Sequence, residues 1–542
     1  MRMKRITALA LAGCLTASML TACGNANSTS GAASGSASAA TTETAEVPAD
    51  AGLHNLSDGV LDIGTTIKWD SLTPLRSQVG NNAPWAYQVY ETLAVLNYDK
   101  EYKPQVAKSW SAQDDGLTFD VEIYDYVTDS AGNNITANDI VWMINLSKEA
   151  GLKPCFSKVE SATATGDYTL QIKMTQDMVG AFEAILTNTF VVSQAAYEAS
   201  GDEFATQIVS TAPYVITEFT PGSTMTIEKR DDYWQDPELV DPSYAANVDK
   251  ITYHVITEAS QAGIALETGE LDGFMTLDAN TANQFVGNPD FTMIDTPYIN
   301  GYQMFFSGDP SRAIESDVNL RQAICYAIDC EGLITGVFAG YGTKMHDSAA
   351  NTAVGYLEKW AEEDYYPYDP EKAKELLAQS NYNGEELVLL AGSNSTSQRL
   401  TQMIQGYLAQ VGINVTLNLA DQALLTSIRL DGSQYDMFIN TVGGDWLADH
   451  WSTRYDMNAY ATGNACARHD EVLAEMLYST WTKEGYTEEN IDAVHAYIRD
   501  NMYGFGMVQP NNIDIWRSEI GLTEPIRTNK GSVNWAASVY NA

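Results

Sequence analysis

The chain has 542 residues, of which 45% are hydrophobic, and its formal net charge is −41 with a sequence pI of about 4.2. A chain of this length and composition can bury the cores of two or three globular domains. Nucleic acid and anionic lipid surfaces are polyanions, so the negative charge argues against either as a binding partner.

The N-terminus has the features of a secretory signal peptide. Basic residues at 1–5 precede a short apolar stretch at 6–19, and the tetrapeptide LTAC follows at 20–23. This tetrapeptide resembles the lipobox of bacterial lipoproteins, whose cysteine carries a diacylglycerol and becomes the new N-terminus. A second match ends at Cys14, but its apolar stretch is too short, and an ordinary signal peptide is the other alternative. We therefore expect a signal peptide at 1–22, a lipid on Cys23, and a location outside the cytoplasm at the cell membrane.

Residues 24–50 are small and polar with almost no apolar content, so we expect 23–57 to be a flexible tether between an anchor and a folded part. No later segment has a run of about 18 apolar residues, so the lipid is expected to be the only membrane attachment. The remaining cysteines show neither C-x-x-C nor zinc-finger spacing. Cys325 and Cys330 lie in or beside a helical pattern and are expected to be buried thiols, while a disulfide between Cys155 and Cys466 stays open.

Two stretches of the chain alternate between strand and helix patterns. The first has strands at 251–256, 271–276 and 291–295, separated by helices at 260–268 and 279–286. The second has strands at 386–390, 413–417 and 435–441, separated by helices at 395–410 and 421–430. Each is a β-α-β-α-β pattern, which implies a parallel sheet with helices on its faces. We therefore predict an α/β protein with two lobes.

Start signals mark three further helices. Thr136 and Asp139 resemble a capping box in which aspartate replaces the usual glutamate. Ser316 is the predicted N-cap of a helix that starts at Asp317. Asp369 places a cap residue before a proline at the first helical position.

The stretch GGDWLADHW at 443–451 follows the predicted strand 435–441 after one residue. Ligands of open α/β sheets bind beyond the carboxyl ends of the strands, and Gly443 and Gly444 let the backbone turn and a ligand approach. We interpret the stretch as the rim of a cleft between the lobes. The alternative is a surface loop whose tryptophans pack back on the protein.

Short motifs recur in a fixed order from about residue 61 to the end. They are YETL at 90–93, KPQVAKSW at 103–110, DDGLTF at 114–119, TANDIV at 136–141, TAPY at 211–214, DYW at 232–234, NLRQAI and AID at 319–324 and 327–329, and WLAD at 446–449. Their order and spacing resemble those of the extracytoplasmic solute-binding proteins of ABC importers. The resemblance is to family 5, the group that binds dipeptides, oligopeptides and nickel complexes.

The resemblance implies a periplasmic-binding-protein-like fold whose two lobes close on a ligand and then dock on a membrane permease. It places lobe I at 58–300 and 508–542, with an extra subdomain near 86–205, and lobe II at 301–507. In peptide binders of the family the aspartate of the WLAD-like motif, here Asp449, receives the peptide α-ammonium. The ligand backbone pairs with the preceding strand end, here from Asn440 to Gly444, and with a lobe I segment near 77–81.

Two departures from the family pattern bear on the ligand. His450 and Trp451 stand where peptide binders often have a turn with Asp-Pro or Glu-Pro. Dipeptide binders carry an arginine for the ligand carboxylate soon after the strand that here is 386–391. This chain has AGSN at 391–394 and Arg399 a turn into the next helix. We therefore expect oligopeptides, or another ligand with an amine, rather than strict dipeptide specificity.

Other ligand classes stay open at this stage. Trp446 and Trp451 suit the stacking of an oligosaccharide, Trp85 of lobe I is expected to line the same cleft, and His450 with His469 suits a nickel chelate. A catalytic carboxylate pair of Asp445 and Asp449 is the enzyme alternative. The chain lacks the G-x-S-x-G, H-E-x-x-H, Walker A and G-x-G-x-x-G motifs. We expect a monomeric binding protein rather than an enzyme, without cofactor or bound metal.

Overall fold

The computed structural model of the chain describes residues 59–540 apart from 76–84, 98–100, 242–243, 299, 350, 364, 444–445, 462–463 and 523–532. The predicted signal peptide, Cys23 and the predicted tether at 23–57 lie outside the described residues, as do the segment 77–81 and Gly444. Within the described residues, no helix has the length and apolar character that crossing a membrane requires.

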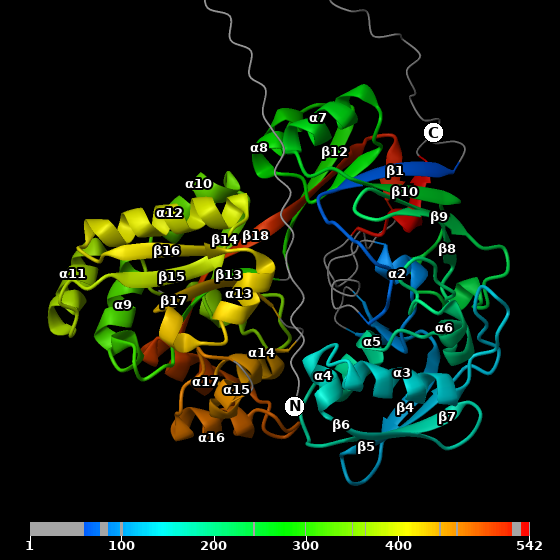
Figure 1. The fold of residues 1–542 in the computed structure, drawn as a ribbon, viewed down its shortest axis with the longest axis horizontal. Coiled ribbons are helices and arrows are strands. Elements are labelled where there is room, and N and C mark those ends of the chain that lie inside the picture. The colour runs from blue at the N-terminus through cyan, green and yellow to red at the C-terminus, as the bar shows by residue number, and fades with distance from the viewer. Residues whose placement is uncertain are drawn as a thin grey trace, which may run out of the picture. The chain divides into compact units, whose positions relative to one another are not determined.

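Twelve strands form one continuous sheet, ten of them in the order β16-β15-β17-β13-β18-β11-β1-β10-β9-β8. The long strand β18 (Gly504–Arg517) lies in the middle of this order. Its first half pairs with β13 (Gly301–Phe306) and β14 (Gly342–Lys344), and its second half pairs with β11 (Gly273–Met275) and β12 (Phe291–Pro297). Figure 1 shows β18 as one strand that connects the two groups of elements. We call the described residues of 59–297 lobe I and those of 301–503 lobe II.

In lobe II, β15 (Leu387–Gly392) pairs in parallel with both β16 (Val415–Ala420) and β17 (Met437–Val442). The second predicted β-α-β-α-β run is therefore confirmed. Its two helices are α12 (Ser395–Gln410) and α13 (Gln422–Ile428). The other helices of lobe II are α9 (Val318–Ala327), α10 (Cys330–Phe338), α11 (Pro370–Gln379), α14 (Leu447–Arg454), α15 (Met457–Ala461), α16 (Glu471–Ser479) and α17 (Glu488–Asn501).

In lobe I, only part of the first predicted run is parallel. β1 (Val60–Thr65) pairs in parallel with β10 (Lys250–Val255) and with β11, and α7 (Ala259–Thr268) connects β10 to β11. The third strand of the run, β12, instead pairs antiparallel with β18. The prediction of a wholly parallel sheet was wrong here, because the C-terminal strand β18 takes the place beside β11. The remaining elements of this sheet and its helices are α8 (Ala279–Ala282), β9 (Thr224–Lys229) and β8 (Tyr214–Thr220).

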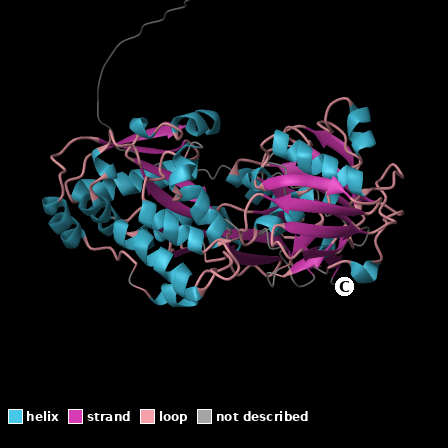
Figure 2. Ribbon diagram, turned by 90° about the horizontal axis from the view of Figure 1, so that it is seen from below, coloured by secondary structure: helices cyan, strands magenta, loops and turns pink. Residues whose placement is uncertain are grey.

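Lobe I also contains a separate antiparallel sheet with the order β4-β5-β7-β6. Its strands are β4 (Ala107–Ala112), β5 (Thr118–Ile123), β6 (Val159–Ala164) and β7 (Thr169–Met174). Helices α3 (Ala137–Glu149) and α5 (Ala181–Asn188) share a buried core with this sheet that includes Ile140, Ile172 and Phe182. Figure 2 shows strands flanked by helices in both lobes. Short elements complete lobe I and the C-terminus: α2 (Ala86–Val89), α4 (Pro154–Ser157), α6 (Gln194–Ser200), β2 (Ala94–Leu96), β3 (Tyr102–Pro104), β19 (Ile520–Leu522) and β20 (Ser538–Tyr540).

Two of the three predicted helix starts are confirmed and one is shifted. The Asp139 carboxylate accepts a hydrogen bond from the backbone N–H of Thr136 at 2.9 Å, and Asp369 caps α11 with Pro370 in its first turn. The N-cap of α9 is Asp317 rather than Ser316, because the Asp317 carboxylate accepts a hydrogen bond from the backbone N–H of Leu320 at 3.0 Å.

The cysteines of the described residues are buried free thiols. Cys325 lies in α9 and Cys330 opens α10, as predicted, and both belong to the core of lobe II. Cys155 belongs to the core around the four-stranded sheet, whereas Cys466 belongs to a core cluster of lobe II. The disulfide between Cys155 and Cys466 that the sequence left open is therefore not formed in this structure.

Candidate ligand-binding site

Helix α14 carries the central part of the predicted site. Trp446 has an extended backbone and precedes the helix, which begins shortly after β17 ends. Leu447 and Trp451, one helical turn apart, are fully buried in a core cluster of lobe II and fix the helix there. Ala448 packs into the core around the four-stranded sheet of lobe I. The first turn of α14 therefore carries Asp449 close to lobe I.

Asp449 is paired with a lysine of lobe I. The Lys158 Nζ lies 2.7 Å from the Asp449 Oδ1 and 3.0 Å from the Met178 Sδ. The Lys158 side chain is only 14% exposed, whereas the Asp449 side chain is 46% exposed. A carboxylate offers about four acceptor positions on its two oxygens. Asp449 thus already binds an ammonium group in this structure and has acceptor capacity left for a second donor.

Trp446 is held between the two lobes. Its indole Nε1 donates a hydrogen bond to the Tyr102 hydroxyl at 3.1 Å, and its ring lies 5.4 Å from the ring of Tyr486. Gly180, which precedes α5, lies against the indole, and a Cβ on Gly180 would sit 2.4 Å from the Trp446 Cδ1. The φ of Gly180 is +75°, a conformation that side chains disfavour. Glycine is therefore required at 180 both by its backbone conformation and by the approach of Trp446.

We expect Gly180→Ala to lower the free energy of unfolding by about 2–4 kcal/mol, the sum of the positive-φ cost and the overpacking against Trp446. Gly201→Ala is the matched control. Gly201 has a φ of +69° and no heavy atom within 4 Å of the added Cβ, so its loss should be about 1 kcal/mol. Urea unfolding of both variants measures the difference. Equal losses would show that the contact with Trp446 contributes nothing.

The other predicted ligand-binding residues occupy different environments. Asn440 lies in β17 opposite Gln303 of β13 and is half-buried, and Gly443 follows the end of β17. Trp85 is fully buried beside α2, in a lobe I core where its ring meets the ring of Trp69 edge-on at 6.2 Å. Packing therefore accounts for Trp85 in this structure, and its contact with a ligand stays a prediction.

Arg399, the other residue considered for a ligand carboxylate, also faces lobe I. It lies in α12, and its Nη2 is 3.9 Å from the Oδ2 of Asp278, the N-cap residue of α8. The Arg399 side chain is 41% exposed, so the charge is largely solvated. Lys158–Asp449 and Arg399–Asp278 are thus two ion pairs that join the lobes at different places.

His450 and His469, the residues considered for nickel, lie in different environments. His450 is buried, and its Nε2 lies 2.6 Å from the backbone carbonyl oxygen of Ser348, where it donates a hydrogen bond. Burial, together with the charge of Arg454, lowers the pKa of His450 to about 4. His469 is exposed. Among the described residues there is no group of three His, Cys, Asp or Glu side chains placed to hold a metal ion.

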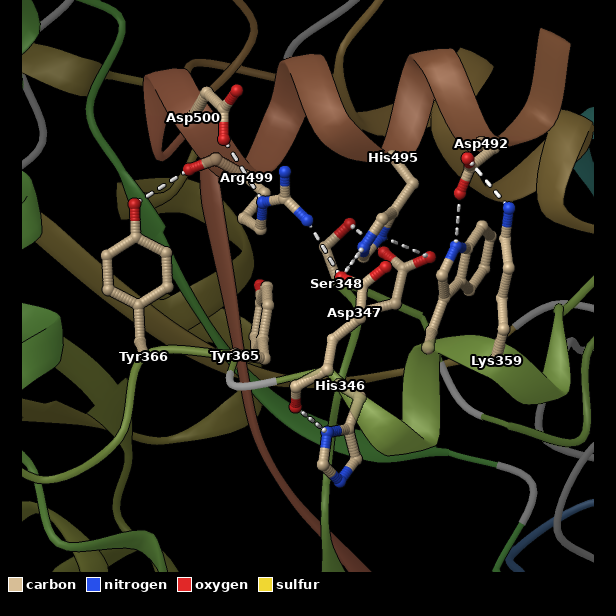
Figure 3. Close-up of polar contacts among 12 residues, drawn as sticks. His346, Asp347, Ser348, Lys359, Tyr365, Tyr366, Asp492, His495, Arg499 and Asp500 are labelled. Carbon is tan, nitrogen blue, oxygen red and sulfur yellow. Dashed lines mark hydrogen bonds and ion pairs between the residues drawn. The ribbon is translucent and has the colours of Figure 1, made fainter. Parts of the chain in front are cut away.

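A partly buried polar network, which the sequence did not predict, joins helix α17 to the segment 346–348 (Figure 3). Its centre is His495 on α17, whose Nδ1 lies 3.4 Å from the Asp347 Oδ2 and whose Nε2 lies 3.1 Å from the Glu363 Oε2. The Ser348 hydroxyl donates a hydrogen bond to the Asp347 carboxylate at 3.0 Å, and the Ser348 carbonyl oxygen accepts one from the His450 Nε2. The network therefore connects α17 to the helix that carries Asp449.

The charges around His495 raise its pKa. Burial alone would lower the pKa of the imidazole, but its hydrogen bonds to Asp347 and Glu363 and their negative charges outweigh that effect. Glu363 is paired in addition with Arg499, whose Nη1 lies 2.8 Å from the Glu363 Oε2. The network thus places the His495 imidazole between two carboxylates, one of which is also paired with a guanidinium.

A known protein family matches the larger part of the chain. Residues 101–464 match the family model of bacterial extracellular solute-binding proteins, family 5. The chain belongs to this family. Because the match covers more than half of the chain, the family resemblance seen in the sequence motifs is confirmed.

Several curated relatives bear the name glutathione-binding protein GsiB. The protein from Escherichia coli O1:K1 is 28% identical over 347 residues, which cover 62% of this chain and 64% of that protein. The protein from Pectobacterium atrosepticum is 26% identical over 377 residues, which cover 67% of this chain and 69% of that protein. This family 5 chain therefore aligns with about two thirds of the length of these relatives.

Solved structures establish the fold. The oligopeptide-binding protein AppA of Bacillus subtilis, in complex with a nonapeptide, has a TM-score of 0.72 at 17% identity, covering 89% of this chain and 98% of that one. NikZ of Campylobacter jejuni, in complex with Ni(L-His), has a TM-score of 0.72 at 16% identity, covering 89% and 99%. At these identities the likeness shows the fold alone. The predicted fold class, a two-lobe α/β periplasmic-binding-protein-like fold, is confirmed.

Proposed function

We propose that this family 5 protein captures peptides with a free N-terminus between its two lobes and delivers them to an ABC permease. One observation supports the peptide class most directly. Asp449, the aspartate of the WLAD motif, binds the ammonium group of Lys158 at 2.7 Å and is still 46% exposed. A peptide α-ammonium has the same charge and the same donors, so the carboxylate is suited to receive it.

The surroundings of Asp449 favour a peptide over the alternatives. The neighbouring strand β17 ends beside the site and offers backbone groups for pairing with an extended ligand. Relatives of similar fold or sequence are named for glutathione, a nonapeptide complex and a nickel–histidine complex, so glutathione and nickel chelates belong in a ligand screen. The buried His450 donates to a backbone carbonyl, which leaves the nickel alternative without a histidine pair. An oligosaccharide remains the third class to test.

The proposed domain division is lobe I at 58–300 and 508–542, with the subdomain near 86–205, and lobe II at 301–507. Strand β18 runs through the boundary at 507 and 508 and pairs with both lobes. We expect lobe closure to bend the chain at this strand and at the connection between β12 and β13. The ion pairs Lys158–Asp449 and Arg399–Asp278 would then open when the lobes separate.

The proposed anchor is a lipid on Cys23, after removal of residues 1–22, with 23–57 as the tether. The motif LTAC at 20–23 supports it. Metabolic labelling with a palmitate analogue should be lost in Cys23→Ala and kept in Cys14→Ala. The reverse result would move the modified cysteine to Cys14. We also propose that the protein is a monomer.

A thermal-shift screen of the chain from residue 24 tests the proposed ligand class. Its members are oligopeptides, glutathione, oligosaccharides and nickel chelates. A ligand present at 100 times its Kd stabilises the folded state by about 2.7 kcal/mol, which a melting curve resolves. We expect stabilisation by peptides with a free N-terminus. Stabilisation by oligosaccharides or nickel chelates alone would overturn the peptide proposal.

A further inference from the structure

A small cavity in lobe II has two arginines in its wall and no acidic side chain. The space in which the centre of a water molecule could lie is about 10 Å³. The cavity is lined by Phe305, Phe438, Arg429, Arg454, Asn464 and Cys466. A cavity of this size holds about one particle as large as a water molecule. The two arginines therefore place two positive charges beside a space that fits one small molecule or ion.

Arg454, at the end of α14, is half-buried and forms no ion pair with a described residue. Its guanidinium carbon lies 5.7 Å from the centre of the Phe305 ring, and its buried Nε has no hydrogen-bond partner among the described residues. Nor does the guanidinium form an ion pair with any described carboxylate. A guanidinium carries five N–H donors, and burying a charge without a partner costs several kcal/mol.

Arg429, at the end of α13, adds a second charge to the same cavity. Its side chain also forms no ion pair with a described residue, and its charge adds to burial in lowering the pKa of Arg454. The two cations repel each other, and an anion bound between them would offset this repulsion.

Two other arginines of lobe II find partners within the protein. The buried Arg321 donates to the backbone carbonyls of Ile314 at 2.8 Å and Met502 at 3.1 Å, and the half-buried Arg312 forms an ion pair with Asp436. The chain has 71 acidic and 30 basic residues, so carboxylates are abundant. Arg454 nevertheless forms no ion pair with a described residue, which points to a partner that is not part of the chain.

We propose that this cavity binds a small monovalent anion of the size of chloride, held by Arg454 and Arg429. The site is separate from the proposed peptide function. The volume favours a halide over sulfate or phosphate, which are several times larger than one water molecule. The edges of aromatic rings are electropositive and the Cys466 thiol is a weak donor, so the remaining walls also suit an anion.

Thermal unfolding of the full chain, followed by the fluorescence of its 11 tryptophans, tests the site. Sodium gluconate is replaced by sodium chloride, bromide or sulfate at constant ionic strength, because salt also screens the net charge of −41. We expect chloride and bromide to raise the Tm saturably and sulfate not to do so. An equal rise in all salts, which screening alone would produce, would overturn the proposal.

Two variants and one control assign the effect to the cavity. Arg429 is half-buried, and Arg429→Gln should need about tenfold more chloride or more for the same rise, since it loses a charged hydrogen bond. Arg454→Met should have a Tm independent of chloride. Lys372→Gln removes one positive charge at an exposed position of α11 and should behave as the wild type. An unchanged chloride response in both arginine variants would place the anion elsewhere and overturn the proposal.

Discussion

Asp449→Asn is expected to weaken the binding of a peptide with a free N-terminus by roughly 30-fold or more. Removing one partner of a desolvated charge pair costs on the order of 2–5 kcal/mol, and each 1.4 kcal/mol is tenfold in Kd. The substitution keeps the shape of the side chain and removes the charge that now holds Lys158 at 2.7 Å. Isothermal titration calorimetry measures the change. Asp445→Asn, four positions earlier in the same stretch, is the charge control and should change the affinity little.

Lys158 provides a second test of the same site. Its ammonium occupies the Asp449 Oδ1 and lies where it would compete with, or repel, a peptide α-ammonium. Lys158→Met also removes a contact between the lobes, which affects every ligand. The informative quantity is therefore the ratio of the Kd values for the N-acetylated and free peptide. We expect this ratio to be larger in Lys158→Met than in the wild type and close to one in Asp449→Asn. If neither substitution changes the ratio of the two Kd values, the Lys158–Asp449 ion pair only joins the lobes and does not recognise the peptide N-terminus.

His495→Phe is expected to lower the free energy of unfolding by about 3–5 kcal/mol at neutral pH, the typical cost of breaking a buried ion pair. Phenylalanine keeps the stacking on Trp360, whose ring lies 4.2 Å from the imidazole in the wild type. The substitution leaves the Asp347 carboxylate, 1% exposed, without its cation, whereas Glu363 keeps Arg499. Urea unfolding measures the loss. His469→Phe, at an exposed position, is the matched control and should change the stability little.

The double variant His495→Phe with Asp347→Asn separates the charge from the packing. Asparagine is neutral, so the double variant should recover part of the loss, with a coupling of about 1–3 kcal/mol. The pH dependence of the stability shows whether His495 contributes as a positive charge. Because the pKa of His495 is raised above 6.5, its contribution is complete below that pH and is lost as the pH rises through the folded-state pKa. The difference between wild type and His495→Phe should therefore shrink at alkaline pH. A difference independent of pH would mean that His495 is neutral in the folded protein.

Local signals account for what the sequence predicted well. The predicted helix 395–410 coincides with α12 because both of its ends are marked. Asn394 accepts a hydrogen bond from the backbone N–H of Ser397 at 2.9 Å, and Gly412 beyond the end has a φ of +90°. The strand predicted at 435–441 is β17 shifted by one or two residues. Periodicity and caps act over a few residues, so one sequence is enough to read them.

Long-range contacts account for what the sequence could not predict. Lys158 is 291 positions from Asp449, and nothing in the residues around it marks it as the partner. The pairing of β18 with both lobes likewise depends on strands far apart in the chain, which is why lobe I was expected to be wholly parallel. Gly180 could be recognised as a possible turn residue, but only the structure shows that Trp446 excludes a side chain there.

The most direct test of the proposed function is a calorimetric titration of the wild-type protein with one peptide in its free and N-acetylated forms. Acetylation removes the α-ammonium and leaves the rest of the ligand unchanged. If Asp449 receives the ammonium, acetylation should raise the Kd by roughly 30-fold or more, as Asp449→Asn should. Equal affinity for the two forms would contradict the assignment of Asp449 and, with it, the proposal that this site recognises the N-terminus of a peptide.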